Sequence, residues 1–143
     1  MSSETIHIIN GPNLNMLGRR ENRIYGKGTL EDLTQMLKKT AGDTPLAFFQ
    51  SNSEAELVGY IQDLKPKSKV ILNAGAFTHT SIALRDALLA VEAEFIEVHI
   101  SNIFARESFR HTSYLSDIAR GVIVGFGFDS YRLALLYFLH QHE

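Results

Sequence analysis

The sequence predicts an α/β fold in which five parallel strands form a doubly wound sheet. Short runs rich in β-branched residues alternate with stretches of helical periodicity, which is the pattern of a parallel sheet with crossover helices. Three of these runs end in polar, chemistry-capable segments, at 10–15, 73–79 and 99–102. Because the carboxyl ends of parallel strands share one edge, where ligands bind, the three segments predict a single site.

Apolar runs of about five residues mark the strands, and capping signals mark the helices between them. The predicted strands are 5–9, 46–50, 69–73, 95–99 and 121–125. Thr29 and Asp32 open the first helix, which has Leu30, Leu33 and Leu37 at helical spacing. These positions predict a helix that packs one apolar face on the sheet.

The next two helices have similar start signals. Ser53 and Glu56 have the spacing of a capping box, and Pro66 ends the helix that they open. Thr80 and Ser81 offer caps for the helix after the third strand, which continues through residue 91.

The carboxyl-terminal part of the chain completes the pattern. Ser113 or Ser116 can start a short helix before the fifth strand, and Asp129 is predicted to cap the last helix, from Ser130 to about His140. The apolar residues noted on this helix are Leu133, Leu136 and Tyr137. The order of elements is flavodoxin-like, with strand order 2-1-3-4-5 in one domain over residues 1–143.

Length and composition exclude several classes of protein. The chain has 143 residues, 45% of them hydrophobic and 21% charged, as in an ordinary globular domain. The net charge of −2 argues against a nucleic-acid partner. The chain has no apolar run long enough to span a bilayer, so we expect no membrane partner and a cytoplasmic protein. There are no cysteines, and the six histidines lack ligand spacing, so no metal site is predicted.

One segment between the first strand and its helix is much longer than a usual connection. Residues 18–28 are bracketed by glycines and contain four cations and one tyrosine, Tyr25. Long loops in compact domains are often lids or binding loops, so we name residues 18–28 the lid segment. A solvated surface loop is the alternative.

The fourth strand contains two ionisable residues that alternate onto one face, Glu97 and His99. One interpretation is an acid–base histidine whose charge is tuned by a carboxylate, and the other is a satisfied pair in the core. His79 follows the third strand and, taken alone, is more typical of a loop or capping histidine.

The remaining polar candidates also have plain structural explanations. Arg106 and Arg110 lie on one face if their stretch is helical, and they have acidic neighbours that could neutralise them. Asn13 and Asn73 end strands, where asparagine is a common turn residue. Asp86 lies on a helix next to an arginine with which it could form a surface ion pair.

Two other functions of this fold class would require residues at other positions. A flavin-binding electron carrier needs a phosphate cradle after the first strand, but residues 10–15 contain no Ser or Thr, and the chain has no Trp. A phospho-acceptor signalling domain needs acidic residues at strand ends, where this chain has Asn10 and Asn73.

Several motifs in register resemble type II 3-dehydroquinate dehydratase over essentially the whole chain. They are NGPNLN at 10–15, LG at 17–18, Arg20, YG at 25–26, QSN at 50–52, NAGAFTHTS at 73–81, RDA at 85–87, EVHISN at 97–102, ARE at 105–107 and FRHxSY at 109–114. The resemblance implies a flavodoxin-like fold and trans dehydration of 3-dehydroquinate to 3-dehydroshikimate through an enolate, in the shikimate pathway and without a metal or organic cofactor.

The resemblance also implies the roles of the catalytic residues. Tyr25 is the base that removes a proton next to the substrate ketone, and Arg20 stabilises charge beside it. His99 is the acid that protonates the departing hydroxyl, and Glu97 orients it. Asn13 helps to hold a water molecule against the enolate oxygen.

Substrate-binding residues follow from the same resemblance. Asn73 and the backbone at Ile100 and Ser101 bind the substrate carboxylate, while His79 and Arg110 bind ring hydroxyls.

Two further residues belong to this set. The resemblance implies that Arg106 binds the substrate. It also implies that Asp86 reaches the site of a neighbouring subunit, in trimers that assemble into dodecamers.

The residues themselves support this chemistry, because Tyr25 on the lid segment and His99 on the sheet would face a bound ring from opposite sides. Lys69 at the other edge and Lys27 between glycines are poorly placed for an imine.

Overall fold

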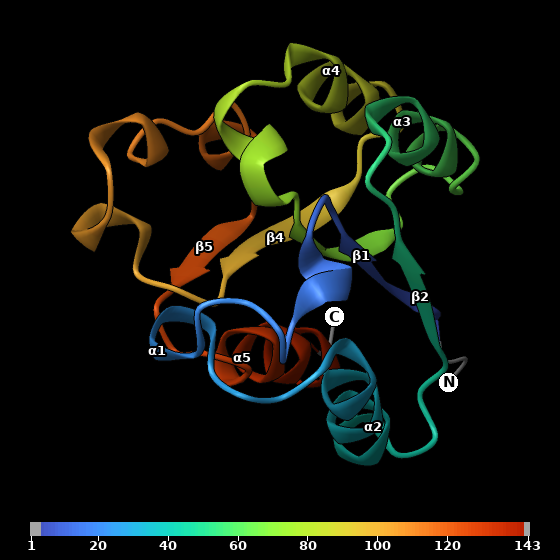
Figure 1. Ribbon diagram of the computed structural model, residues 1–143. Coiled ribbons are helices and arrows are strands. Elements are labelled where there is room, and N and C mark those ends of the chain that lie inside the picture. The colour runs from blue at the N-terminus through green and yellow to red at the C-terminus, as the bar shows by residue number, and fades with distance from the viewer. Residues whose placement is uncertain (1–3, 142–143) are drawn as a thin grey trace.

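A computed structural model describes residues 4–141, in which five parallel strands form one sheet (Figure 1). The strands are β1 (Ile6–Asn10), β2 (Leu46–Gln50), β3 (Lys69–Asn73), β4 (Glu94–His99) and β5 (Gly121–Val124). Their order is β2-β1-β3-β4-β5, which confirms the predicted fold class and strand order. Residues 1–3 and 142–143 of the predicted domain lie outside the described residues.

Helices cover both faces of the sheet. They are α1 (Asn22–Tyr25), α2 (Leu30–Ala41), α3 (Glu54–Gln62), α4 (Ile82–Ala90) and α5 (Asp129–Leu139). Short 3-10 helices lie at Leu14–Met16, Gly75–His79, Ile103–Ala105, Ser108–Arg110 and Ser116–Ile118. In Figure 1, α3 and α4 lie on one face, and α1, α2 and α5 lie on the other. Within residues 4–141, no helix is long and apolar enough to cross a membrane.

The alternation of side chains along the strands divides the core into two layers. Ile8 and Ile71 are fully buried against α2 and α5, whereas Ile9 and Leu72 pack against α3 and α4. β1 and β3, at the centre of the sheet, therefore supply apolar side chains to both faces, as a doubly wound sheet requires.

The predicted helix starts are partly confirmed. Thr29 and Asp32 form a complete capping box at α2, in which each side chain accepts a hydrogen bond from the other residue's backbone N–H. Ser53 caps α3, but the Glu56 side chain accepts from the Ser51 hydroxyl at 2.5 Å rather than from Ser53 N–H, so the predicted capping box is only half formed. Ser81 caps α4 through the backbone N–H of residue 84.

The predicted bounds of α5 agree with the structure to one residue at each end, but the predicted cap is wrong. Phe128 occupies the cap position without a side-chain cap bond, and Asp129 is the first helical residue, where it pairs with Arg132 at 3.0 Å. The helix begins earlier than expected, and Leu133 is 43% exposed. The buried positions are Tyr131, Ala134, Leu135 and Phe138.

The lid segment is ordered around one short helix rather than extended as a loop. Gly18 and Gly26, with φ of 89° and 82°, occur on either side of α1 in left-handed conformations that favour glycine. A Cβ at Gly28 would come within 2.6 Å of the Phe128 ring, so the segment packs closely on the start of α5. Tyr25 is only 8% exposed and packs with the core residues on the α2 and α5 face of the sheet.

Both ends of the described chain lie at the amino edge of the sheet. Glu4 forms an ion pair with Lys69, the first residue of β3, at 3.7 Å. Gln141 donates to the carboxylate of Glu94, the first residue of β4, at 3.1 Å. The carboxyl edge, where the polar motifs follow the strands, is therefore on the opposite side of the molecule.

Candidate active site

A cavity of about 110 Å³ lies at the carboxyl edge of the sheet, beneath the lid segment. It is bounded by the turns after β1 and β3, the end of β4 and α1. Its lining residues are Pro12, Asn13, Leu14, Arg20, Tyr25, Asn73, Gly75, Ala76, His79, His99, Ile100, Ser101, Ile103, Arg106 and Arg110. The structure thus brings together every residue predicted for the site except Glu97, which lies behind His99, and Asp86.

Strand register fixes one wall of the cavity. Asn10 pairs with Asn73 across the ends of β1 and β3, and Tyr131 of α5 joins their side chains. Its hydroxyl donates to Asn10 Oδ1 at 2.5 Å and accepts from Asn73 Nδ2 at 2.9 Å. Complete burial raises the pKa of Tyr131, so the phenol stays neutral and keeps its donor proton. The Asn73 amide is thereby held in one orientation.

The turn after β1 approaches the turn after β3 very closely. A Cβ at Gly11 would lie 2.3 Å from the backbone oxygen of Ala74, so no larger residue fits there without displacing the backbone. Asn13 follows with φ of 71°, and its N–H donates to the side chain of Asn52 at 2.9 Å. These contacts orient Asn13 at the rim of the cavity.

The acidic residue of β4 is buried behind the predicted acid. His99 Nε2 donates to Glu97 Oε2 at 2.6 Å, and the Glu97 side chain is fully buried. The hydroxyls of Ser113 and Ser116 donate to Glu97 Oε1 at 3.1 and 2.6 Å. Burial raises the pKa of Glu97, but the hydrogen bonds from His99 and the two serines outweigh it and lower the pKa overall. Glu97 is therefore a carboxylate, and His99 Nδ1 is the nitrogen left for a ligand.

The imidazole ring of His79 lies beside the ring of His99. Their rings are 6.3 Å apart and nearly parallel, and His79 Nδ1 donates to the backbone oxygen of Thr112 at 2.7 Å. The pKa of His79 is lowered, chiefly because burial disfavours the imidazolium and also because His99 and Arg110 are close. A neutral His79 with a protonated Nδ1 has its Nε2 available as an acceptor.

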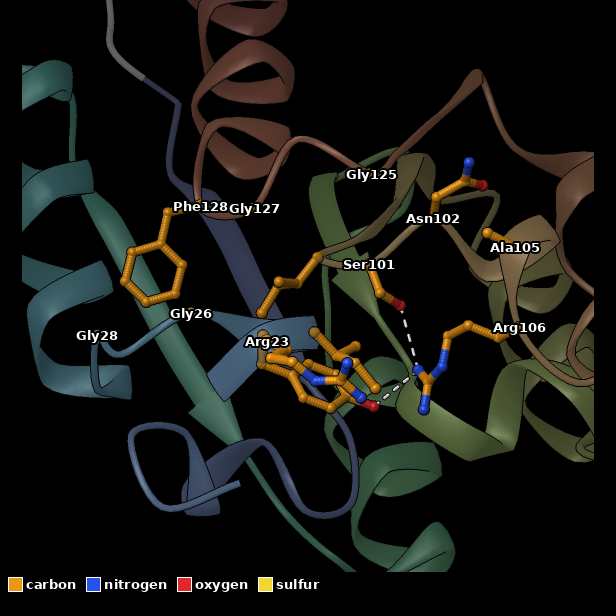
Figure 2. Close-up of a pocket in the computed structure, with 13 residues that line it drawn as sticks. Arg23, Gly26, Gly28, Ser101, Asn102, Ala105, Arg106, Gly125, Gly127 and Phe128 are labelled. Atoms are coloured by element: carbon orange, nitrogen blue, oxygen red, sulfur yellow. Dashed lines mark hydrogen bonds between the residues drawn. The ribbon is translucent and has the colours of Figure 1, made fainter. Parts of the chain in front are cut away.

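Two guanidinium groups converge on the Tyr25 hydroxyl. Arg20 donates to it at 2.8 Å, and Arg106 donates at 2.7 Å while also donating to Ser101 Oγ at 3.1 Å. Figure 2 shows Arg106 with its contacts drawn as dashed lines. Within the lid segment, Arg20 contacts the Tyr25 hydroxyl, whereas Arg19 donates to the sulfur of Met16 at 3.7 Å.

The two arginines that follow β4 do not share a helix face as supposed. Arg106 has an extended backbone after one 3-10 helix, and Arg110 ends the next. Both still line the cavity, because the chain turns twice between them. Arg110 also pairs with Glu107 at 2.7 Å, so the acidic neighbour and the cavity share its guanidinium.

Asp86 lies away from the cavity of its own chain. It is exposed on α4, and the surface ion pair suggested for it is not formed. Its neighbour Arg85 instead makes a bidentate pair with Asp117, at 2.5 and 3.0 Å. Within one chain, Asp86 contributes nothing to the site.

A second, wider groove of about 610 Å³ adjoins the cavity (Figure 2). Tyr25, Ser101 and Arg106 border both spaces, and Arg23 and Phe128 line the groove alone. The smaller cavity is the candidate site, because its lining, and not that of the groove, includes Asn13, Asn73, His79 and His99. No lysine lines either of the two spaces.

Sequence reasoning did not assign three contributors. The sequence predicts Ser113 and Ser116 as possible helix starts, with Ser113 also in a motif of the family, and it assigns no role to Tyr131. A signal was present for the serines, because a buried carboxylate on a strand needs donors and a Ser-x-x-Ser segment follows β4.

The fold and the cavity define an α/β enzyme with its site at the carboxyl edge of a parallel sheet. Residues 4–139 match the family model described as dehydroquinase class II. The 3-dehydroquinate dehydratase of Azorhizobium caulinodans is 54% identical over 93% of this chain and 92% of its own. That of Prochlorococcus marinus is 55% identical over 90% of each chain.

Solved structures of type II dehydroquinases are also similar to this chain. The type II dehydroquinase from Butyrivibrio crossotus has a TM-score of 0.90 at 39% identity, covering 99% of this chain and 100% of that one. The one from Propionibacterium acnes also has a TM-score of 0.90, at 41% identity, covering 97% and 98%. The chain therefore belongs to the type II 3-dehydroquinate dehydratases, which are hydro-lyases.

Proposed function

We propose that this enzyme converts 3-dehydroquinate into 3-dehydroshikimate by trans elimination through an enolate, as a step of the shikimate pathway. Tyr25 removes a proton from the carbon next to the substrate ketone, which gives the enolate. His99 then protonates the departing hydroxyl, which leaves as water. Both proton transfers use side chains of this chain, so the proposal needs no metal or organic cofactor.

The observation that best supports this proposal is the placement of a base and an acid on different elements around one cavity. The Tyr25 oxygen accepts charged hydrogen bonds from Arg20 and Arg106, which stabilise a phenolate. His99 is backed by the Glu97 carboxylate, which stabilises its protonated form. One residue comes from the lid segment and the other from β4, which suits removal of two groups from opposite ring faces.

The remaining lining residues have proposed binding roles. Asn73 and the backbone at Ile100 and Ser101 bind the substrate carboxylate, and Asn13 holds a water molecule against the enolate oxygen.

The other polar lining residues surround the ring. His79 and Arg110 bind its hydroxyls, and Arg106 contacts the substrate as well as Tyr25. The lid segment closes over the ligand, which the presence of its residues Arg20 and Tyr25 in the cavity lining supports. Asp86 completes the site of a neighbouring subunit in trimers that assemble into a dodecamer.

Two substrate samples test the stereochemistry, each deuterated at one of the two hydrogens of the methylene carbon that lies between the ketone and the carbon bearing the leaving hydroxyl. Product formation is followed by the ultraviolet absorbance of the enone, and the mass of the product shows whether deuterium is retained. Trans elimination predicts loss of deuterium only from the position anti to the leaving hydroxyl. Loss from the syn position would overturn it, and a lysine adduct after borohydride reduction with substrate would indicate an imine instead of an enolate.

A further inference from the structure

The Glu97 carboxylate is held from the side opposite His99 by two hydroxyl groups. Glu97 is fully buried, and burying a charge costs free energy unless hydrogen bonds replace its water. Oε2 is used by His99, and Oε1 accepts from Ser113 and Ser116 at 3.1 and 2.6 Å. Residues 113–116, named here the serine turn, thus supply all the other side-chain donors to this carboxylate within residues 4–141.

Both hydroxyls are committed as donors to Glu97. Ser113 Oγ accepts hydrogen bonds from the backbone N–H groups of Leu115 and Ser116, each at 3.0 Å, so its own proton is directed at the carboxylate. Glu97 is the side-chain partner to which Ser116 Oγ donates, with a short distance typical of a charge-assisted bond.

Contacts from three other parts of the chain fix the serine turn in place. Leu115 is fully buried in the core beside α3 and α4, and Tyr114 N–H donates to the backbone oxygen of Thr78 at 3.0 Å. Arg85 donates to the backbone oxygen of Tyr114 at 2.9 Å and forms an ion pair with Asp117. Neither serine lines the cavity, so the two hydroxyls reach the site through Glu97.

We propose that Ser113 and Ser116 are positioning residues of the dehydratase reaction, which keep Glu97 ionised and aimed at His99 so that His99 holds the proton for the leaving hydroxyl. The inference rests on the role proposed above for His99. It adds the serine turn to the catalytic apparatus as a support that never touches the substrate.

Loss of a serine hydroxyl has a predictable direction. The charged and titratable groups around Glu97 are His99 on its own strand, His79 from the 3-10 helix after β3, and Arg110 beyond His79. With one donor fewer, Glu97 takes up a proton at higher pH, and a neutral Glu97 stabilises His99 less when it is protonated. The acidic limb of the kcat profile then moves to higher pH, by about one unit, as expected for one hydrogen bond to a charge.

The matched variants Ser116→Thr and Ser116→Val test the proposal, because they add similar bulk and differ in the hydroxyl. Both are assayed with 3-dehydroquinate from pH 5 to 9 in the purified enzyme, with circular dichroism to verify folding. We expect Ser116→Thr to keep the wild-type profile, and Ser116→Val to show the shifted acidic limb and a lower kcat, with KM changed by less than about twofold. Exposed Ser108→Ala is the control for loss of a serine elsewhere, and it should behave as wild type.

Superimposable profiles for Ser116→Thr and Ser116→Val would overturn the proposal, as would a loss confined to KM. If the threonine variant does not fold, Ser116→Ala against the wild type makes the same comparison without added bulk. His99→Ala separates the two levels of inference. If it stays active, the proposed acid is wrong. If it is inactive while the Ser116 variants match the wild type, only the role of the serine turn fails.

Discussion

Tyr25 accepts hydrogen bonds from two guanidinium groups that belong to different parts of the chain. Arg20 comes from the same segment, and its guanidinium carbon lies 3.8 Å from the centre of the Tyr25 ring. Arg106 comes from beyond β4 and ties the same oxygen to Ser101. The phenol oxygen is therefore held at a fixed point of the cavity wall, as a base that must reach one particular proton requires.

The substitution Tyr25→Phe should abolish nearly all activity while the enzyme stays folded. It removes only the oxygen that Arg20 and Arg106 contact, and general base catalysis is typically worth ~10²–10⁴-fold in rate. We expect kcat for 3-dehydroquinate to fall by at least about 100-fold. Tyr137→Phe, at a half-buried tyrosine of α5 that lines neither the cavity nor the groove, is the control. Activity within a few-fold of the wild type would contradict the assignment of the base.

Glu97 should make the stability of the protein depend on pH. Its pKa is lowered in the folded state, so its carboxylate contributes stability that is present above the unfolded value and lost as pH falls through the folded value. We expect the free energy of unfolding of the wild type to fall more steeply below about pH 4.5 than that of Glu97→Gln. Urea titrations between pH 3 and 7 measure this, with exposed Glu92→Gln as control. Parallel curves would show that Glu97 is not the linked group.

How far the residue contacts could be predicted depends on sequence separation. Arg20 is five positions from Tyr25, so a contact between them was foreseeable. Arg106 is 81 positions from Tyr25, in a segment that contains no strand or α-helix. No periodic pattern in the sequence therefore predicts that the two residues are in contact. Glu97 and His99 alternate on one strand, and their hydrogen bond follows from that spacing.

Among the elements, α5 has a second function beside covering the sheet. Its first turn inserts Tyr131 between the ends of β1 and β3, where the hydroxyl connects Asn10 to Asn73. A buried helix residue thus orients an amide that lines the cavity. The apolar face of α5 therefore combines packing with control of the site.

The substitution Tyr131→Phe should weaken both stability and substrate binding. It removes the hydroxyl that donates to Asn10 Oδ1 and accepts from Asn73 Nδ2, so these two buried amide atoms lose their partner. A buried polar group without a partner lowers the free energy of unfolding by about 1–3 kcal/mol. We expect a lower urea midpoint and a higher KM from a free Asn73 amide, with a smaller change in kcat. Tyr137→Phe, on the partly exposed side of the same helix, should change stability by less than about 0.5 kcal/mol. Equal effects of the two substitutions would contradict this account.

At the level of elements, strands were more predictable than helix faces. The β1 and β3 runs are apolar, so their positions agree with prediction to about one residue. In α5 almost every position is apolar, so the sequence offers no contrast from which to choose the buried face. The face that is buried is determined by packing against β3 and β4. Tyr131 is buried on this face, whereas Leu133 is exposed to solvent.

For the whole molecule, the exposed face of α4 is the feature that a single chain does not explain. Ile82 and Leu89 are 56% and 49% exposed, and Asp86 lies between them on the same helix face. Exposed apolar side chains that are grouped on one face are a mark of a protein contact, here a contact with another subunit. It agrees with the proposal that Asp86 serves the site of a neighbouring subunit.

The substitution Asp86→Ala should weaken substrate binding or the trimer contact while each subunit stays folded. An exposed aspartate without a role would change stability by less than about 0.5 kcal/mol and leave activity unaltered. Light scattering of the wild type should give an assembly built from trimers, and steady-state kinetics of the variant should show the loss. Asp43→Ala, at an exposed position of the amino edge, is the control. A fully active wild-type monomer would refute the shared site.

The ion pair of Glu4 with Lys69 and the contact of Gln141 with Glu94 also matter for handling the enzyme. Both lie at the amino edge, while the cavity opens at the carboxyl edge. A flexible tether fused beyond either residue therefore begins about as far from the reacting groups as the length of a strand allows. Immobilisation on a support through either tether should leave the cavity facing the bulk solution, so that substrate supply is governed by diffusion and not by the attachment.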